Sequence, residues 1–159
     1  MTTGRFVIVG ASLAGGSAAA ALREGGFEGE LTLIGEEPRL PYSRPALSKG
    51  YLRGQERFED QLVNPADYYG KQRITVRLGA RATRVDPARR VVELGGGETV
   101  PYDRLLVTTG GRNRALRTPG AELPGIFRLR TVEDCDRIRG AARAGARAVV
   151  VGMASSDPR

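Results

Sequence analysis

The order of apolar and polar stretches in the first 50 residues predicts a strand, a turn, a helix and a second strand. Phe6–Val9 is a short continuous apolar run, which is typical of a central parallel strand buried on both faces. An alanine-rich segment follows the turn and predicts a helix to Glu24, where Gly25 is a helix stop. A second apolar run, Leu31–Ile34, ends in Gly35. This order predicts an α/β fold with a parallel sheet and a crossover helix.

Prolines mark two short helices in the next part of the chain. Pro45 can open a helix over Ala46–Leu52 at its first position, and this helix would carry Lys49. A second helix is predicted over Ala66–Lys71, with Asn64 as its cap and Pro65 at its first position. Both helices would lie between the first two strands and a third, predicted at residues 74–78 from its alternating pattern.

The second half of the chain begins with short strands separated by turn residues. Asp86-Pro87 and Gly95–Gly97 divide residues 83–101 into three runs, which predicts a small antiparallel meander. Arg104–Thr108 predicts another buried strand. A helix capped by Thr131 should continue to about residue 144, and Ala146–Gly152 predicts a last strand that ends in glycine.

The turn between the first strand and the first helix carries the first candidate chemistry. Gly10 permits a sharp turn, and Gly15 would let the helix pack closely on the strand. Ser12 stands where the dinucleotide-binding fingerprint usually has its second glycine. Glu36 lies 21 residues after Gly15, where the fingerprint has its ribose-binding acid, although a solvated loop carboxylate is the alternative. The unit as a whole predicts a Rossmann-like dinucleotide site with a pyrophosphate at the helix N-terminus.

Composition narrows the function classes. The chain has 159 residues and a formal net charge of +7, and its basic residues are almost all scattered arginines. A nucleic-acid-binding protein is therefore an alternative, but no recognition motif or basic stripe supports it, and we expect no nucleic-acid partner. Without histidine and with Cys135 as the single cysteine, the chain has no intrachain disulfide and no zinc or iron–sulfur ligand set, so no metal site is expected. No stretch suits a membrane span, and a cytoplasmic location is expected.

Five ordered segments together resemble a known family. They are Val7–Gly15, Leu33–Pro38, Leu40–Lys49, Tyr102–Arg112 and Phe127–Thr131. They resemble the N-terminal part of the FAD-dependent ferredoxin/rubredoxin reductases, a branch of the pyridine nucleotide–disulfide oxidoreductase-like flavoproteins that serves oxygenase and cytochrome P450 electron chains. The resemblance implies electron transfer from NAD(P)H through FAD to a [2Fe-2S] ferredoxin or a rubredoxin. The disulfide-reductase cousins have a redox cysteine pair after the second strand, and this chain has no cysteine there.

The resemblance also implies roles for individual residues. Arg44 and Lys49 would lie along the flavin side of the cofactor, and Lys49 is the candidate catalytic residue. Arg130 would reach the FAD from the loop before the last helix, although Arg44 and Arg130 could also be ordinary surface arginines. The other implied contacts come from two turns that wrap the cofactor, from an acidic side chain that binds the ribose, and from a backbone group near the adenine. The candidate FAD-binding residues are Gly10, Ser12, Ala14, Gly15, Glu36, Arg44, Lys49, Ala82, Thr109, Gly110 and Arg130.

After Gly152 the chain departs from the family pattern. A second glycine fingerprint, for NAD(P)H, should begin there, but Ala154 and Asp157 stand where glycines are needed. We therefore expect a partial FAD-binding domain over residues 1–148 and the truncated start of a second nucleotide-binding domain over 149–159. Such a chain should fold marginally alone and bind FAD weakly or not at all. Two hypotheses stay open: an electron-transfer flavoprotein that is inactive as this fragment, and a non-catalytic FAD- or nucleotide-binding module or functionless remnant.

Overall fold

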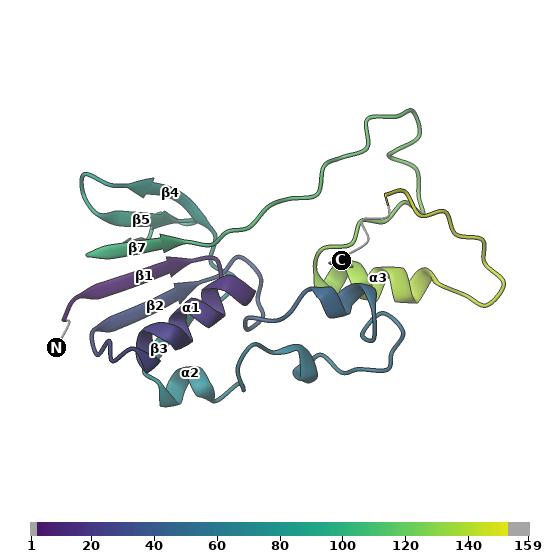
Figure 1. Cartoon of the computed structure of the whole chain (residues 1–159). Helices are drawn as coiled ribbons and strands as arrows, with labels where there is room; N and C mark the ends of the chain where they lie inside the picture. The colour runs from purple at the N-terminus through teal and green to yellow at the C-terminus, as the bar shows by residue number, and fades with distance from the viewer. Residues whose placement is uncertain (1–2, 153–159) are drawn as a thin grey trace, which may run out of the picture.

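The computed structural model describes residues 3–152, which form two sheets with helices around them (Figure 1). The larger sheet is parallel and has the strand order β3-β2-β1-β7. The smaller sheet is antiparallel and has the order β4-β5-β6. The strands are β1 Arg5–Val9, β2 Glu30–Ile34, β3 Ile74–Arg77, β4 Ala82–Asp86, β5 Val91–Leu94, β6 Thr99–Pro101 and β7 Arg104–Val107. The predicted fold class, a parallel sheet with a crossover helix and a small antiparallel meander, is confirmed.

Helix α1 (Leu13–Glu24) connects β1 to β2 and ends at Gly25, as the sequence predicts. The parallel strands end at one level, because Val9 is in register with both Ile34 of β2 and Val107 of β7. The chain therefore leaves three neighbouring strands at the same edge of the sheet. This edge is where ligands bind in open α/β folds.

The central strand β1 of the parallel sheet is covered on both faces. Val7 and Val9 of β1 pack with Val92 and Leu94 of β5, so the antiparallel sheet covers one face. Ile8 points the other way and packs with Ala19 of α1 and with residues of β2 and α2 (Tyr68–Lys71). The alternation along β1 accounts for its uninterrupted apolar sequence, because each face of the strand meets a different layer.

A third apolar cluster joins parts of the chain that are far apart in the sequence. Tyr42 and Leu47, from the segment around the 3₁₀ helix η1 (Pro45–Ser48), pack against Val132 and Cys135 of α3 (Val132–Ala141). A second 3₁₀ helix, η2, spans Glu59–Gln61. Figure 1 shows α3 beside η1 and away from the small sheet, with a long loop from β7 leading to it. The cap of α3 is the predicted Thr131, which forms a capping box with Asp134.

Several predicted element boundaries are wrong. The helix expected over Ala46–Leu52 is the shorter η1 followed by turns, because its hydrogen bonds follow the i→i+3 pattern. The helix expected over Ala66–Lys71 begins at Tyr68 with Asp67 as its cap, since the Tyr68 N–H closes a turn onto Pro65 instead. The last helix ends at Ala141, before the predicted residue 144.

Two predicted strands also differ from the structure. Ala146–Gly152 forms no strand within the described residues, and Val149 is 90% exposed there. A strand needs a hydrogen-bonded neighbour, and no described segment pairs with it. The strand at Arg104–Val107 is present as β7, but it is not buried, because in residues 3–152 it pairs with β1 alone and leaves Val107 57% exposed. None of the helices in residues 3–152 has the length and apolarity to cross a bilayer.

Candidate functional site

A cleft of about 260 Å³ opens at the carboxyl ends of β1, β2 and β7. The strand order reverses here, because the chain continues from β1 to β2 on one side and reaches β7 on the other. Ligands of open α/β sheets bind at such a switch point. The cleft is lined by Val9, Gly10, Ala11, Ser12, Ile34, Glu36, Glu37, Arg44, Ala80, Arg81, Ala82, Thr108, Thr109, Gly111, Arg112, Arg130 and Thr131.

The glycine turn brings three backbones into contact beside the cleft. Gly10 has φ +119°, and a Cβ there would collide with the backbone of Thr108. A Cβ on Gly15 would collide with the carbonyl oxygen of Gly10, so α1 rests directly on the turn. The Thr108 hydroxyl donates to that same oxygen at 2.9 Å. Both predicted glycine roles, the sharp turn and the close helix packing, agree with these contacts.

The N-terminus of α1 opens into the cleft. Ser12, the N-cap residue, lines the cleft, has extended backbone angles (φ −123°, ψ −160°) and makes no side-chain capping bond within the described residues. The first turn of α1 carries no acidic residue. The positive end of the helix dipole and the unpaired N–H groups of the first turn are therefore available to an anion.

The charges around the cleft favour an anion as well. Glu36, beyond the end of β2, lies 3.5 Å from Arg81, and both side chains are about 60% exposed. Four arginines against two glutamates give the lining a net charge of two positive. These residues are Arg44, Arg81, Arg112, Arg130, Glu36 and Glu37.

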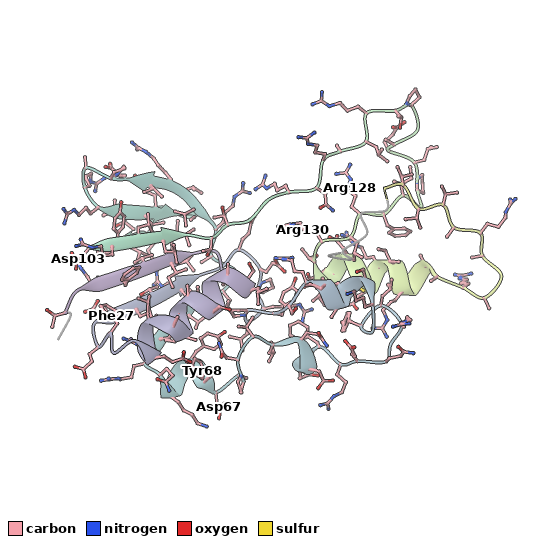
Figure 2. The ribbon with its side chains drawn as sticks, in the orientation of Figure 1. Phe27, Asp67, Tyr68, Asp103, Arg128 and Arg130 are labelled. Atoms are coloured by element: carbon pink, nitrogen blue, oxygen red, sulfur yellow. The ribbon has the colours of Figure 1, made fainter. Side chains whose placement is uncertain are left out.

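Glu37 is the centre of a half-buried polar network. Its carboxylate accepts a hydrogen bond from the Tyr42 hydroxyl at 2.6 Å and forms an ion pair with Arg44. Arg44 also donates to the Tyr42 oxygen at 3.2 Å and to the carbonyl oxygen of Arg130 at 2.5 Å. Burial, together with the bond to Glu37, raises the pKa of Tyr42, so its hydroxyl remains a donor at neutral pH. Figure 2 shows Arg130 between the sheet and α3, with Arg128 in the same part of the loop.

The structure brings most of the predicted site residues together. Seven of the eleven line the cleft: Gly10, Ser12, Glu36, Arg44, Ala82, Thr109 and Arg130. Gly15 lies directly behind the turn, and Gly110 follows Thr109 with φ +68°. Ala14 is exposed in the first turn of α1. Lys49 is exposed at the end of η1 and does not line the cleft. The roles of all eleven in binding stay predictions.

Sequence reasoning missed several lining residues, above all Glu37, Arg81 and Arg112. Each is a direct neighbour of a predicted residue or lies in a segment that carries the family resemblance, so its place in the sequence could have indicated it. No local sequence pattern, such as that of the glycine turn, marks these residues. No cluster of His, Cys, Asp and Glu in residues 3–152 could hold a metal ion.

The chain is similar in sequence to several reductases. It is 41% identical to rhodocoxin reductase of Rhodococcus erythropolis over an alignment of 147 residues, and this alignment covers 92% of this chain and 34% of the relative. It is 39% identical over 145 residues to the ferredoxin–NAD(+) reductase subunit of the benzene 1,2-dioxygenase system of Pseudomonas putida, covering 91% of this chain and 35% of the relative. The chain thus spans about a third of the length of the curated relatives that it matches.

Solved structures give the same result. The reductase in the covalent putidaredoxin reductase–putidaredoxin complex aligns with a TM-score of 0.81 and 38% identity over 87% of this chain and 34% of that one. The ferredoxin reductase for the CYP199A2 system of Rhodopseudomonas palustris aligns with a TM-score of 0.80 and 34% identity, over 87% of this chain and 33% of that one. The family model described as pyridine nucleotide-disulphide oxidoreductase matches residues 4–154. With the glycine turn and cleft in the expected place, the chain belongs to the pyridine nucleotide-disulphide oxidoreductase family.

Proposed function

We propose that this chain is the FAD-binding part of an NAD(P)H-dependent ferredoxin reductase, which passes electrons to a [2Fe-2S] ferredoxin or a rubredoxin. The names of the relatives support the reaction, since two of them, 40% and 39% identical to this chain, are named ferredoxin–NAD(P)(+) reductase and ferredoxin–NAD(+) reductase. The observation that carries the proposal is the cleft itself. It combines a glycine turn in backbone contact with its neighbours, an open helix N-terminus and a net positive lining.

The residues of the cleft fit the adenosine diphosphate half of FAD. The Gly10 turn and the N-terminus of α1 would hold the pyrophosphate, whose two negative charges match the charge of the lining. Glu36 would accept hydrogen bonds from the ribose hydroxyls, and Ala82 would contact the adenine. The cleft volume of about 260 Å³ is slightly below the range typical of small-molecule sites, about 300–1,000 Å³, so the cleft suits half of the cofactor better than all of it.

The proposed chemistry needs a flavin, because a bound FAD accepts a hydride and releases electrons one at a time. The chain's own residues bind and orient that group. Ser12 can donate to a phosphate oxygen, and Arg44 and Lys49 are proposed to lie on the flavin side. No disulfide can form within this chain, since Cys135 is its single cysteine and the thiol is buried, donating to the Leu47 carbonyl oxygen.

The domain division is also a proposal. Residues 1–148 would form the FAD-binding unit, and residues 149–159 would begin a nucleotide-binding unit for NAD(P)H. The apolar run Val149–Val151 supports this division, since such a run ending in glycine is how the first fingerprint begins. The positions of the expected second fingerprint, Ala154 and Asp157, lie outside the described residues.

A titration of the 159-residue chain with FAD tests the proposal. FAD should bind weakly, as expected for a partial FAD-binding domain, but the change in flavin fluorescence should still saturate and be reversed by free ADP, because the cleft fits the ADP half. Gly10→Val is the negative variant, since its side chain would enter the Thr108 backbone. Gly140→Val is the matched control, at an exposed glycine of α3 that does not line the cleft and has no atom within 4 Å of its Cβ position. The proposal is wrong if neither FAD nor ADP shows saturable binding that depends on Gly10.

A second candidate function is a nucleotide-binding module without turnover. The position of Lys49 favours it, because the candidate catalytic residue is exposed and does not line the cleft. Because the reductase is expected to be inactive as this fragment, absence of turnover by the chain with FAD and NADH or NADPH fits both candidates, whereas ferricyanide reduction above a free-FAD control supports the reductase. A downstream reading frame that begins with a glycine fingerprint for NAD(P)H would also support the reductase. Nucleotide binding with no turnover when that product is added supports the module.

A further inference from the structure

Two of the four arginines at the cleft, Arg44 and Arg130, have different surroundings. Arg44 is compensated, because it forms an ion pair with Glu37 and directs one nitrogen at both the Tyr42 oxygen and the Arg130 carbonyl oxygen. Arg130 has no side-chain ion pair within residues 3–152. One of its guanidinium nitrogens lies 2.9 Å from the place of a Cβ on Gly110. Its charge therefore remains available to a ligand at the second turn.

The backbone of Arg130 is held on both sides. Its N–H donates to the Asp134 carboxylate at 3.0 Å, inside the cap of α3. Its carbonyl oxygen accepts the bond from Arg44 at 2.5 Å. Glu37 is the group that fixes Arg44 in this position, since Glu37 lies three residues after the end of β2 and its side chain is only 24% exposed.

We propose that Glu37 is a positioning residue for anion binding: through Arg44 it holds the Arg130 backbone so that the Arg130 guanidinium faces the cleft beside Gly110. The ligand group in question is the diphosphate, so this inference rests on the proposed function. It reassigns Arg44, whose charge is neutralised by Glu37, from a contact with the cofactor to a brace between β2 and the loop before α3. Arg130 becomes a residue that presents a free positive charge to the cleft.

The positioning role predicts an effect of opposite sign to simple electrostatics. Removing the charge of Glu37 makes the cleft more positive, so charge alone would strengthen the binding of a diphosphate. Loss of the brace would release Arg44 and the Arg130 carbonyl, and would weaken binding instead. The sign of the change in Glu37→Gln separates the two explanations.

Trypsin tests the brace without any ligand. Trypsin cleaves after arginine, and the carbonyl group that it would attack in the Arg130–Thr131 bond is the one to which Arg44 donates. The Arg117–Thr118 bond has the same two residue types and lies in an exposed loop, so it is an internal control. In the wild type we expect cleavage at Arg117 to be on the order of tenfold faster than at Arg130. Glu37→Gln should raise the initial rate at Arg130 several-fold and leave Arg117 unchanged. Glu98→Gln, which removes a carboxylate paired with Arg77 away from the cleft, should change neither.

Binding of ADP tests the link to Arg130, in a double-mutant cycle. Glu37→Gln should weaken ADP binding several-fold in the wild-type background and have no weakening effect in Arg130→Met. Glu37→Asp, which keeps the charge with a shorter reach, should recover part of the affinity. Far-UV circular dichroism checks that each variant is folded.

The results separate failure of the positioning role from failure of the proposed function. Equal trypsin rates at the two bonds in the wild type, or stronger ADP binding in Glu37→Gln, would overturn the positioning role. An equal loss of affinity in both backgrounds would also overturn it, because Glu37 would then act independently of Arg130. A third result would refute the proposed function alone. In that case the wild type binds no ADP, but its Arg130–Thr131 bond is protected from trypsin and Glu37→Gln removes the protection. The role of Glu37 in holding the Arg130 backbone would then stand.

Discussion

The packing of α1 against the glycine turn predicts that replacing glycine by alanine lowers stability at one site and raises it at another. Gly15→Ala places a Cβ inside the carbonyl oxygen of Gly10 and 3.0 Å from the Thr108 hydroxyl oxygen. The first obstacle is backbone, so no side-chain rotation can relieve it. Gly140→Ala introduces the same methyl group on α3, where no atom lies within 4 Å of the Cβ position. The main difference between the two variants is what the methyl group meets.

The magnitudes follow from two effects. Alanine in place of glycine favours a helix by about 1 kcal/mol, and Gly140→Ala, close to the helix end, should keep about half of this. In Gly15→Ala the overpacking costs about 3 kcal/mol, because α1 must move away from the turn. The net change in the free energy of unfolding is a loss of about 2 kcal/mol. For a chain of this length that loss lowers Tm by roughly 4–8 °C, whereas Gly140→Ala should raise Tm by about 1–2 °C.

Thermal unfolding followed by circular dichroism at neutral pH, without nucleotide, measures both changes. The difference between the two variants is the informative quantity, since any effect of alanine on the unfolded chain is common to both. If Gly15→Ala melts at or above the temperature of Gly140→Ala, the close contact between Gly15 and Gly10 does not exist and the reasoning fails.

Two further predictions concern arginine contacts outside the cleft. The Arg23 guanidinium donates to four backbone carbonyl oxygens at 2.5–2.9 Å. Lysine has fewer donors in another geometry, so Arg23→Lys should lower the free energy of unfolding, measured in urea, by about 1–2 kcal/mol. The control Arg117→Lys, at an exposed position, should leave it unchanged. Hydrogen bonds from the Arg5 side chain, and a further one from its backbone N–H, hold the pKa of Asp103 below its usual range. The stabilisation is therefore complete above the unfolded pKa of about 4 and is lost as the pH falls through the lower folded pKa. Tm should therefore fall less steeply between about pH 5 and pH 3 in Asp103→Asn than in the wild type, and equal slopes would contradict the assignment.

Local patterns in the sequence were enough to predict the parallel sheet and the meander. The run Phe6–Val9, the glycines of the turn and the apolar run Leu31–Ile34 specify a strand–helix–strand unit through near neighbours. Thr131 was predictable for the same reason, because its capping box with Asp134 spans three residues. Such features depend on backbone preferences that any fold around them would share.

Long-range contacts account for what the sequence could not show. The bond from Arg44 to Arg130 joins residues 86 positions apart, and no local pattern marks Glu37 as its anchor. The strand predicted at Ala146–Gly152 is wrong for the complementary reason. Its three valines have a high strand propensity, but a strand forms only where another segment accepts its hydrogen bonds, and the described residues offer none.

Ser12 shows which positions of a glycine fingerprint are constrained by the fold and which by the ligand. Gly10 needs its φ of +119°, and Gly15 needs the absence of a Cβ, so both are required before any ligand binds. Ser12 has φ −123°, which any residue adopts, and its side chain faces a cleft with room for it. The fold therefore tolerates serine at the second position, and only the approach of a phosphate can select against a larger side chain there. A deviation at this position is weak evidence against a dinucleotide site, whereas a deviation at Gly10 or Gly15 would be strong evidence.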